Sequence, residues 1–288
     1  MSSQEWRVLY QTIRRIDKTL PRPRRRPEYS DVLIVAMYCF AAAHDRPQSW
    51  ACDPRHYRGT WCRRPLPSQS RFSRRIRSPR CQALLAALPA ATRPVHVQRD
   101  VHHLDSRPLI VGGCSKDHQA RRGWVHGNFG RGYRLHACTT RDGYFAAFRV
   151  TSLNTSEQAT APQLLEEVRP TGWVLGDANF DSAALYVCAA RWGGQLLAPP
   201  RAGAGCGHRP QEPQRLRAIA LWTEHGAWAL RERKAIDRFF GQHSSYGGGL
   251  APLPAWVRTA NRVTRWVTAK VALYHVRRRL RVLQINAA

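Results

Sequence analysis

Strand-like and helix-like segments alternate from about residue 95 onward, and this order limits the possible folds more than any other feature of the chain. Expected strands cover residues 97–111, 133–140, 144–151, 172–176 and 195–198, and expected helices cover residues 156–168 and 182–192. The turn Arg141-Asp142-Gly143 joins the second strand to the third, because an Asp-Gly pair favours a tight hairpin. A three-stranded meander followed by helix, strand, helix and strand indicates a mixed α/β core.

The first 92 residues are instead helical and basic. We expect helices at residues 5–16, 30–44, 69–77 and 81–88, the second with Ser30 as its N-cap. Residues 20–27 contain three prolines, which disfavour helix and sheet pairing, so this run is expected to be a linker or arm.

The remaining chain, residues 93–288, forms the second expected domain. Residues 199–227 are rich in Pro, Gly and Ala and are interpreted as an insertion in it. Two helices, at about 228–242 and 255–283, are expected to close the chain.

The charge of the chain predicts a polyanionic partner. Its 288 residues include 46 Lys and Arg against 19 Asp and Glu, a formal net charge of +27. Self-repulsion on this scale opposes compaction, so the charge is expected to serve nucleic acid, whose phosphates supply most of the affinity. Arginine, which binds phosphate bidentately, dominates the positive charge. A GC-rich genome also enriches arginine, but it does not explain why acidic residues are so outnumbered.

The apolar segments predict no membrane association. Residues 32–43 form the longest apolar stretch, and they are too short to span a bilayer. The first ten residues lack the apolar core of a signal peptide. We therefore expect a cytoplasmic, nucleoid-associated protein with reduced cysteines.

The short basic helix at residues 69–77 is a candidate DNA-binding element. It carries Arg71, Arg74 and Arg75, and it follows a turn as the second helix of a helix-turn-helix does. The same pattern would serve phosphate contact alone, or a solvated helix with Phe72 and Ile76 packed inward.

Three scattered carboxylates occupy places where acids are unusual. Asp105 lies within a strand pattern, Asp177 ends an apolar run where ligand sites of α/β folds gather, and Asp237 lies on a late helix. Two metal ions can activate an attacking water or hydroxyl and stabilise the leaving oxygen, and Mg²⁺ needs few protein ligands. Three converging carboxylates would therefore suffice for phosphoryl transfer.

Several strings resemble the catalytic blocks of the DDE transposases of bacterial insertion sequences, and most closely the insertion-sequence-four and -five group. The core strings are LDSRPLIV, GRGYRLHACTTRDGYFAAFRVTSLNTSE and WVLGDANFDS. RKAIDRFFGQ and LPAWVRTANRVTRWVTAKVALYH resemble the block around the third acid, and PEYSDVLIVAMYCFAAAHDRPQSW and LPSQSRFSRRIR resemble the N-terminal region. The resemblance covers nearly the whole chain.

The resemblance implies a ribonuclease-H-like catalytic core, a mixed sheet flanked by helices, preceded by a helical DNA-binding region. It implies Asp105, Asp177 and Asp237 as catalytic residues and ligands of Mg²⁺ or Mn²⁺, two ions in all. Arg233 matches the arginine four residues before the third acid, a spacing that puts both on one helix face and lets the guanidinium bind DNA phosphate.

The chain departs from the family pattern around the third acid. The family usually has glutamate where this chain has Asp237, tyrosine at Leu230 and lysine at Ser244. Glu232 and Glu224 remain alternatives for the third acid, although Glu232 would face elsewhere and Glu224 precedes the expected helix.

The implied function is that of a transposase which binds the ends of an insertion sequence, cleaves DNA and joins the freed 3′-hydroxyl to target DNA. The resemblance implies double-stranded DNA as the partner and two protomers on paired ends. Two alternatives stay open: a decayed transposase that binds DNA without catalysis, and a nuclease that cannot join strands.

Two nearby polar residues are expected to have structural roles. Asp181 is interpreted as a cap of the helix at Ser182. His103 lies near Asp105 and is expected to be packed or surface-exposed rather than to touch substrate.

Overall fold

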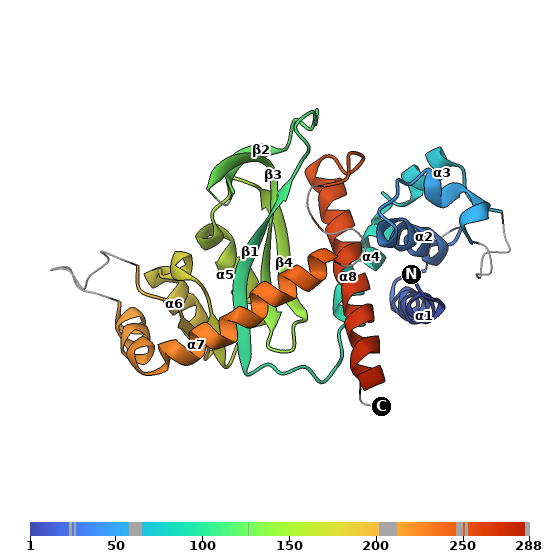
Figure 1. The fold of residues 1–288 in the computed structure, drawn as a ribbon. Helices are drawn as coiled ribbons and strands as arrows, with labels where there is room; N and C mark the ends of the chain where they lie inside the picture. The colour runs from blue at the N-terminus through green and yellow to red at the C-terminus, as the bar shows by residue number, and fades with distance from the viewer. Residues whose placement is uncertain are drawn as a thin grey trace. The chain divides into compact units, whose positions relative to one another are not determined.

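The computed structural model describes the whole chain except residues 23–24, 26, 58–64, 126, 202–211, 246–249, 251–252 and 286–288. It divides into two compact units (Figure 1). Unit 1 comprises Met1–Val95, Ser244–Leu250 and Trp256–Ala288, and unit 2 comprises His96–His243 and Ala251–Ala255. No helix in the part of the chain that the structure describes is both long and apolar enough to span a membrane.

Unit 1 is built from helices. These are α1 (Ser3–Thr19), α2 (Asp31–Ala43), short 3-10 turns at Trp50–Cys52 and Pro54–Tyr57, α3 (Gln69–Arg75), α4 (Pro79–Thr92) and α8 (Ala260–Ile285). Ser30 caps α2 as expected, because its hydroxyl accepts from the Leu33 N–H at 3.2 Å. The expected second domain, residues 93–288, included the last helix; in the structure this helix, α8, instead belongs to unit 1 and packs against α1, α2 and α4.

Unit 2 is a mixed sheet with helices on its faces. Its elements are β1 (Val101–Ile110), β2 (Arg121–Val125), β3 (Asn128–Thr140), β4 (Phe145–Ser152), α5 (Glu157–Val168), β5 (Trp173–Leu175), a 3-10 turn at Ala178–Phe180, α6 (Ala183–Ala190), β6 (Gln195–Leu197) and α7 (Pro213–Ser245). The main sheet has the order β4-β3-β1-β5-β6, and β2 also pairs with β3. The strands that pair with β3 run antiparallel to it, whereas the pairs β1–β5 and β5–β6 are parallel. The predicted mixed α/β sheet flanked by helices is therefore confirmed.

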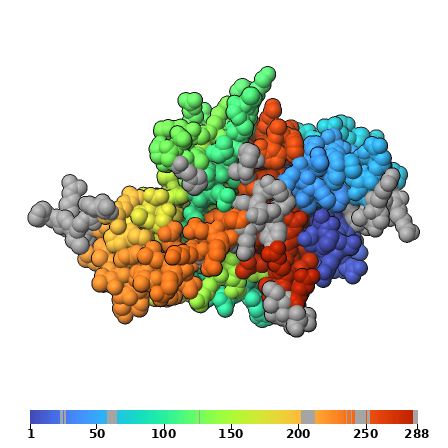
Figure 2. All heavy atoms as spheres, in the orientation of Figure 1, coloured from blue at the N-terminus to red at the C-terminus, as the bar shows by residue number. Residues whose placement is uncertain are grey.

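Alternate residues of the strands enter two different core clusters, because successive strand side chains point to opposite faces. Leu104, Val174 and Leu196 pack in the cluster that includes residues of α5 and α6. Val101 and Leu175 lie in a second cluster with side chains of α7. α7 runs across this second face of the sheet, as Figures 1 and 2 show in orange.

Two elements differ from the expectations. α7 begins at Pro213, so the expected start at residue 228 and the interpretation of residues 213–227 as insertion are wrong. Proline is tolerated in the first turn of a helix. Further along this first part of α7, Ala218 is buried and Trp222 packs against the core. The strand β2 was not expected, because five residues with a central glycine carry little strand signal; β2 forms by pairing with the start of β3.

Gly132 marks a close approach between two strands. A Cβ atom there would lie 2.1 Å from the Leu109 carbonyl oxygen, a backbone atom that cannot turn aside. We expect Gly132→Ala to lower the free energy of unfolding by at least about 2 kcal/mol, because overpacking forces backbone shifts. Urea unfolding measures this change. Gly113→Ala is the matched control, since nothing lies within 4 Å of its added Cβ; equal losses in the two variants would contradict the explanation.

Candidate active site

The register of two parallel strands places Asp105 beside Asp177. β1 pairs with β5 with His103 opposite Leu175, and both aspartates lie two residues further along. Neighbouring strands are about 4.8 Å apart, and a step of two residues returns each chain to the same face. Val101 and Leu175 lie on the face covered by α7, so both aspartates are directed toward that face, at the carboxyl ends of the strands.

Each aspartate is oriented by one backbone N–H group. The Ser106 N–H donates to Oδ1 of Asp105 at 2.7 Å, and the Asn179 N–H donates to Oδ1 of Asp177 at 2.7 Å. No group in the described parts of the chain donates to the second oxygen of either carboxylate. Both side chains therefore keep one acceptor oxygen for a ligand.

Burial and neighbouring negative charge disfavour ionisation of both aspartates. Burial raises the pKa of Asp105 to about 7, with further increases from Asp177 and Glu157, against the effects of the Ser106 N–H and Arg233. Burial also raises the pKa of Asp177, and Glu157 adds to this effect. The site therefore concentrates negative charge that a bound cation would relieve.

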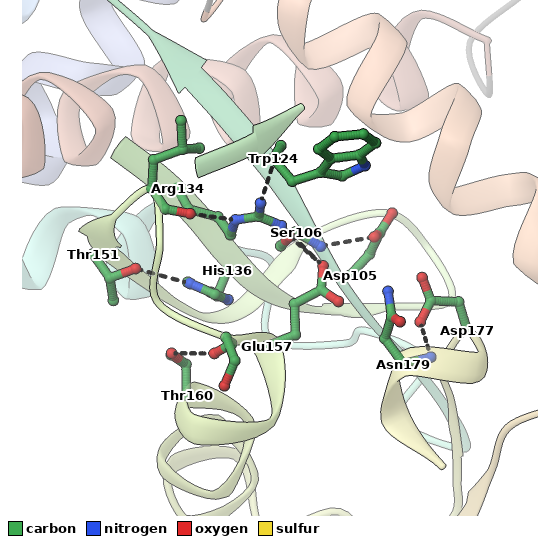
Figure 3. Close-up of polar contacts among 12 residues, drawn as sticks. Asp105, Ser106, Trp124, Arg134, His136, Thr151, Glu157, Thr160, Asp177 and Asn179 are labelled. Atoms are coloured by element: carbon green, nitrogen blue, oxygen red, sulfur yellow. Dashed lines mark hydrogen bonds and ion pairs between the residues drawn. The ribbon is translucent and has the colours of Figure 1, made fainter. Parts of the chain in front are cut away.

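Glu157 is a site residue that sequence reasoning missed. It lies in the first turn of α5, and its Oε1 accepts from the Ser106 hydroxyl and, at 3.5 Å, from Nη1 of Arg134. Figure 3 shows Asp105, Glu157 and Asp177 arriving from β1, α5 and the segment after β5. In the sequence, a Glu directly after the N-cap Ser156 suits the helix dipole, and no local signal distinguishes it from an ordinary capping residue.

α7 brings Arg233 to the carboxylates. The Arg233 charge lowers the pKa of both Asp105 and Asp177, and its Nε is buried without a hydrogen-bond partner among the described residues. Asp237, one turn further along α7, is exposed. The structure thus brings together Asp105, Asp177 and Arg233, while Asp237 faces solvent.

The two alternative third acids lie elsewhere. Glu232 pairs with Arg141 at 2.8 Å. Glu224 is 71% exposed and lies inside α7, so the expectation that it precedes the helix is wrong. The structure places neither residue with Asp105 and Asp177.

The donor chemistry of the site fits Mg²⁺ or Mn²⁺. Within the described ranges no group of three or more His, Cys, Asp and Glu side chains is close enough to hold a metal by itself. Mg²⁺ typically takes one or two carboxylates and completes its shell with water and substrate phosphates. Asp105 and Asp177, each with one oxygen left over, match that requirement.

The basic helix expected to bind DNA is α3, in unit 1. Arg71 pairs with Glu28 at 2.8 Å, and Arg75 pairs with Asp31. Arg74 is exposed, and Phe72 is fully buried. Two of the three arginines therefore already have carboxylate partners within the chain.

Asp181 and His103 have the following environments. The expectation that Asp181 caps α6 is wrong: its carboxylate accepts from Arg215, from the Arg201 N–H and from the Tyr186 hydroxyl. His103 is 2% exposed, as expected for a packed residue, and burial lowers its pKa to about 4.

The raised pKa of Asp105 predicts a pH-dependent stability difference. Below pH 4 the carboxyl group is protonated in the folded and unfolded chains alike. Between pH 4 and 7 only the unfolded chain releases the proton, so the free energy of unfolding falls as the pH rises. Above pH 7 both chains are ionised, and the loss of stability stays constant. The shift of the Asp105 pKa from 3.8 to about 7 lowers the free energy of unfolding by at most about 4 kcal/mol, at roughly 1.4 kcal/mol per pKa unit.

We therefore expect Asp105→Asn to be more stable than the parent at pH 7.5 in EDTA, with the difference vanishing near pH 4. Urea unfolding across this range measures it. Added Mg²⁺ is expected to stabilise the parent and not the variant. A difference that does not change with pH would contradict the assigned charge environment.

Comparison with known protein families gives a match. A family model described as "Transposase DDE domain" matches residues 102–282. No curated protein matches the chain. No solved structure matches it either. The match covers well over half of the chain and includes Asp105, Asp177 and α7, and the chain therefore belongs to the DDE-domain transposase family.

Proposed function

We propose that the chain binds the ends of an insertion sequence and catalyses DNA strand cleavage and strand transfer on a ribonuclease-H-like core. The observation that carries the proposal is the pair Asp105 and Asp177, which lie side by side at the ends of adjacent parallel strands, with the positive charge of Arg233 acting on both. Family membership supports transposase function with phosphoryl-transfer chemistry.

Asp105 and Asp177 would hold Mg²⁺ or Mn²⁺, two ions with DNA bound. Such ions, when bound, activate the attacking water or 3′-hydroxyl and stabilise the leaving oxygen. The Ser106 and Asn179 N–H groups fix the two carboxylates so that their second oxygens remain available. Arg233, with a buried Nε, is placed to bind a phosphate oxygen near both aspartates.

We assign Asp237 as the third carboxylate, from its position in the family pattern four residues after Arg233. Because Asp237 is exposed and one methylene shorter than glutamate, this assignment requires α7 to move toward Asp105 and Asp177 when DNA and metal bind. Of the other family positions, Leu230 is half exposed and presents no hydroxyl group to DNA.

Recognition of the DNA is assigned to the helical unit together with arginine-rich surfaces. Arg74 of α3 is exposed and available to phosphate, while Arg71 and Arg75 would exchange their carboxylate partners for phosphate. Two protomers would hold two element ends.

A cleavage assay tests the proposal. The purified chain is incubated with supercoiled plasmid carrying its flanking DNA repeats, in EDTA, Mg²⁺ or Mn²⁺. We expect metal-dependent nicking at the repeat ends and joined products with target DNA. Binding without cleavage under either metal would replace the enzyme by a DNA-binding protein, and cleavage without joined products would leave a nuclease.

A further inference from the structure

Two aromatic side chains are exposed on the ribbon formed by β2 and the start of β3. Trp124 is 57% exposed and Phe129 is 75% exposed. They are directly opposite each other across the two strands, and their rings meet edge to face with centroids 5.3 Å apart. Exposing large apolar groups to water is unfavourable, so an exposed aromatic pair suggests a binding partner.

The inner face of the ribbon is fixed, which determines where the aromatic pair points. Gly123 and Gly130 alternate with the aromatic residues, and a Cβ at Gly123 would lie 2.8 Å from the Leu153 carbonyl oxygen. At Gly130 the added Cβ would lie 3.0 Å from Ile110. Because the glycine face lies against the body of unit 2, Trp124 and Phe129 must face outward.

The charge around the ribbon favours a polyanion. Between residues 106 and 134 the sequence has six Lys and Arg residues and a single acid. That acid, Asp117, is buried and accepts from the Tyr133 hydroxyl. Arg121 and Arg122 of β2 are exposed and have no carboxylate partner among the described residues. An aromatic pair flanked by arginines matches the stacking platforms that hold unpaired bases.

Hydrogen bonds connect the ribbon to the catalytic carboxylates. Nη2 of Arg134 donates to the Trp124 carbonyl at 3.0 Å, and Nη1 donates to the Ser106 hydroxyl at 3.1 Å. The Ser106 N–H in turn donates to Asp105. Figure 3 shows this sequence of contacts, with Trp124 at one end and Asp105 at the other.

We propose that Trp124 and Phe129 stack on bases left unpaired where the DNA strand is opened beside the carboxylates. The inference rests on the proposed function for the presence of DNA, and it adds the chemistry of the contact: aromatic stacking without base-specific hydrogen bonds. Arg134 acts as a positioning residue, because it holds the Trp124 backbone and Ser106 in one arrangement.

The test measures binding in EDTA, so cleavage does not enter. The probes are a mixed-sequence single strand and the corresponding duplex, each with one 2-aminopurine, whose fluorescence reports stacking. We expect Trp124→Ala and Phe129→Ala to weaken single-strand binding about tenfold or more and duplex binding less than about twofold. Trp124→Phe should retain most of the affinity, because it keeps a ring.

Matched variants separate stacking from other effects. Trp256→Ala removes another exposed tryptophan and is expected to leave both affinities unchanged. Arg122→Ala should weaken both probes and reduce the salt dependence, as a phosphate contact does. Circular dichroism confirms folding of each variant.

Specific results would overturn the inference. Equal losses on both probes in Trp124→Ala would assign the pair to a general contact, and dissociation of a DNA-free dimer in that variant would assign it to a second copy of the chain. If the parent cleaves DNA and Trp124→Ala binds the single strand unchanged, the stacking inference is wrong but the proposed function stands. If the parent stacks on bases but never cleaves DNA, the proposed activity is wrong but the stacking inference stands.

Discussion

Asp177→Asn and Asp105→Asn are each expected to reduce strand cleavage by about a thousandfold or more, with DNA binding retained. A thousandfold loss corresponds to about 4 kcal/mol of transition-state stabilisation. The reason is that each substitution keeps the shape and the backbone hydrogen bond of the side chain but removes the charge that would hold the metal in the proposed site. Initial rates of nicking with Mg²⁺ and gel-shift titrations in EDTA measure the two properties.

Two variants at Asp237 complete this prediction. Asp237→Asn should lose cleavage to a similar degree, while Asp237→Glu, which adds one methylene, should retain or raise it. Glu224→Gln is the matched control on the same helix, because Glu224 is highly exposed and lies far from the third-acid position in sequence. If Asp237→Asn cleaves as the parent does and Glu157→Gln does not, the third carboxylate is Glu157.

Asp181→Asn is expected to cost about 3–5 kcal/mol of folding free energy, the largest stability loss among these variants. The Asp181 side chain is 1% exposed, and Arg215, its ion-pair partner at 3.1 Å, is 9% exposed. Removing one charge of a buried pair leaves the other poorly compensated. Arg215 lies in α7 and Asp181 in the segment after β5, so the pair joins α7 to the sheet. Urea unfolding at pH 7.5 measures the loss.

The control for Asp181 is an exposed pair. Asp100 is 58% exposed and lies 3.5 Å from Arg141. Asp100→Asn should therefore lower the free energy of unfolding by less than about 1 kcal/mol. The double variant Asp181→Asn with Arg215→Met should recover part of the loss, because no uncompensated charge remains.

Burial opposes ionisation of Asp181, but the Arg215 hydrogen bonds help keep its pKa below the usual value. The stability that ionised Asp181 contributes should therefore be lost only as the pH falls below about 4. A loss that persists undiminished in the double variant would point to packing instead.

The local pattern of the sequence predicted the elements whose signals lie within a few residues. The Asp142-Gly143 turn lies between β3 and β4 as expected, and Ser30 caps α2. β2 and the first turns of α7 were not predicted, because the pairing partner of β2 and the packing partners of residues 213–227 come from other segments. A local pattern carries no information about such partners.

The candidate site shows the same division. Asp105 and Asp177 could be selected from the sequence, because each acid stands in or directly after an apolar strand pattern where it is disfavoured without a ligand. Glu157 could not be selected, since its position after an N-cap serine has an ordinary explanation. Only the contact with Ser106, 51 residues away, reveals it as part of the site.

The sequence by itself therefore determined the order of all the strands except β2, the two aspartates proposed for catalysis and the family, because these depend on residue types at short or matched spacings. The tertiary structure decided the neighbours: the register that sets Asp105 beside Asp177, the arrival of Glu157 and Arg233, the Asp181–Arg215 pair and the outward aromatic ribbon. Those depend on contacts between segments far apart in the chain, whose free energy is gained only when the sheet and α7 are assembled.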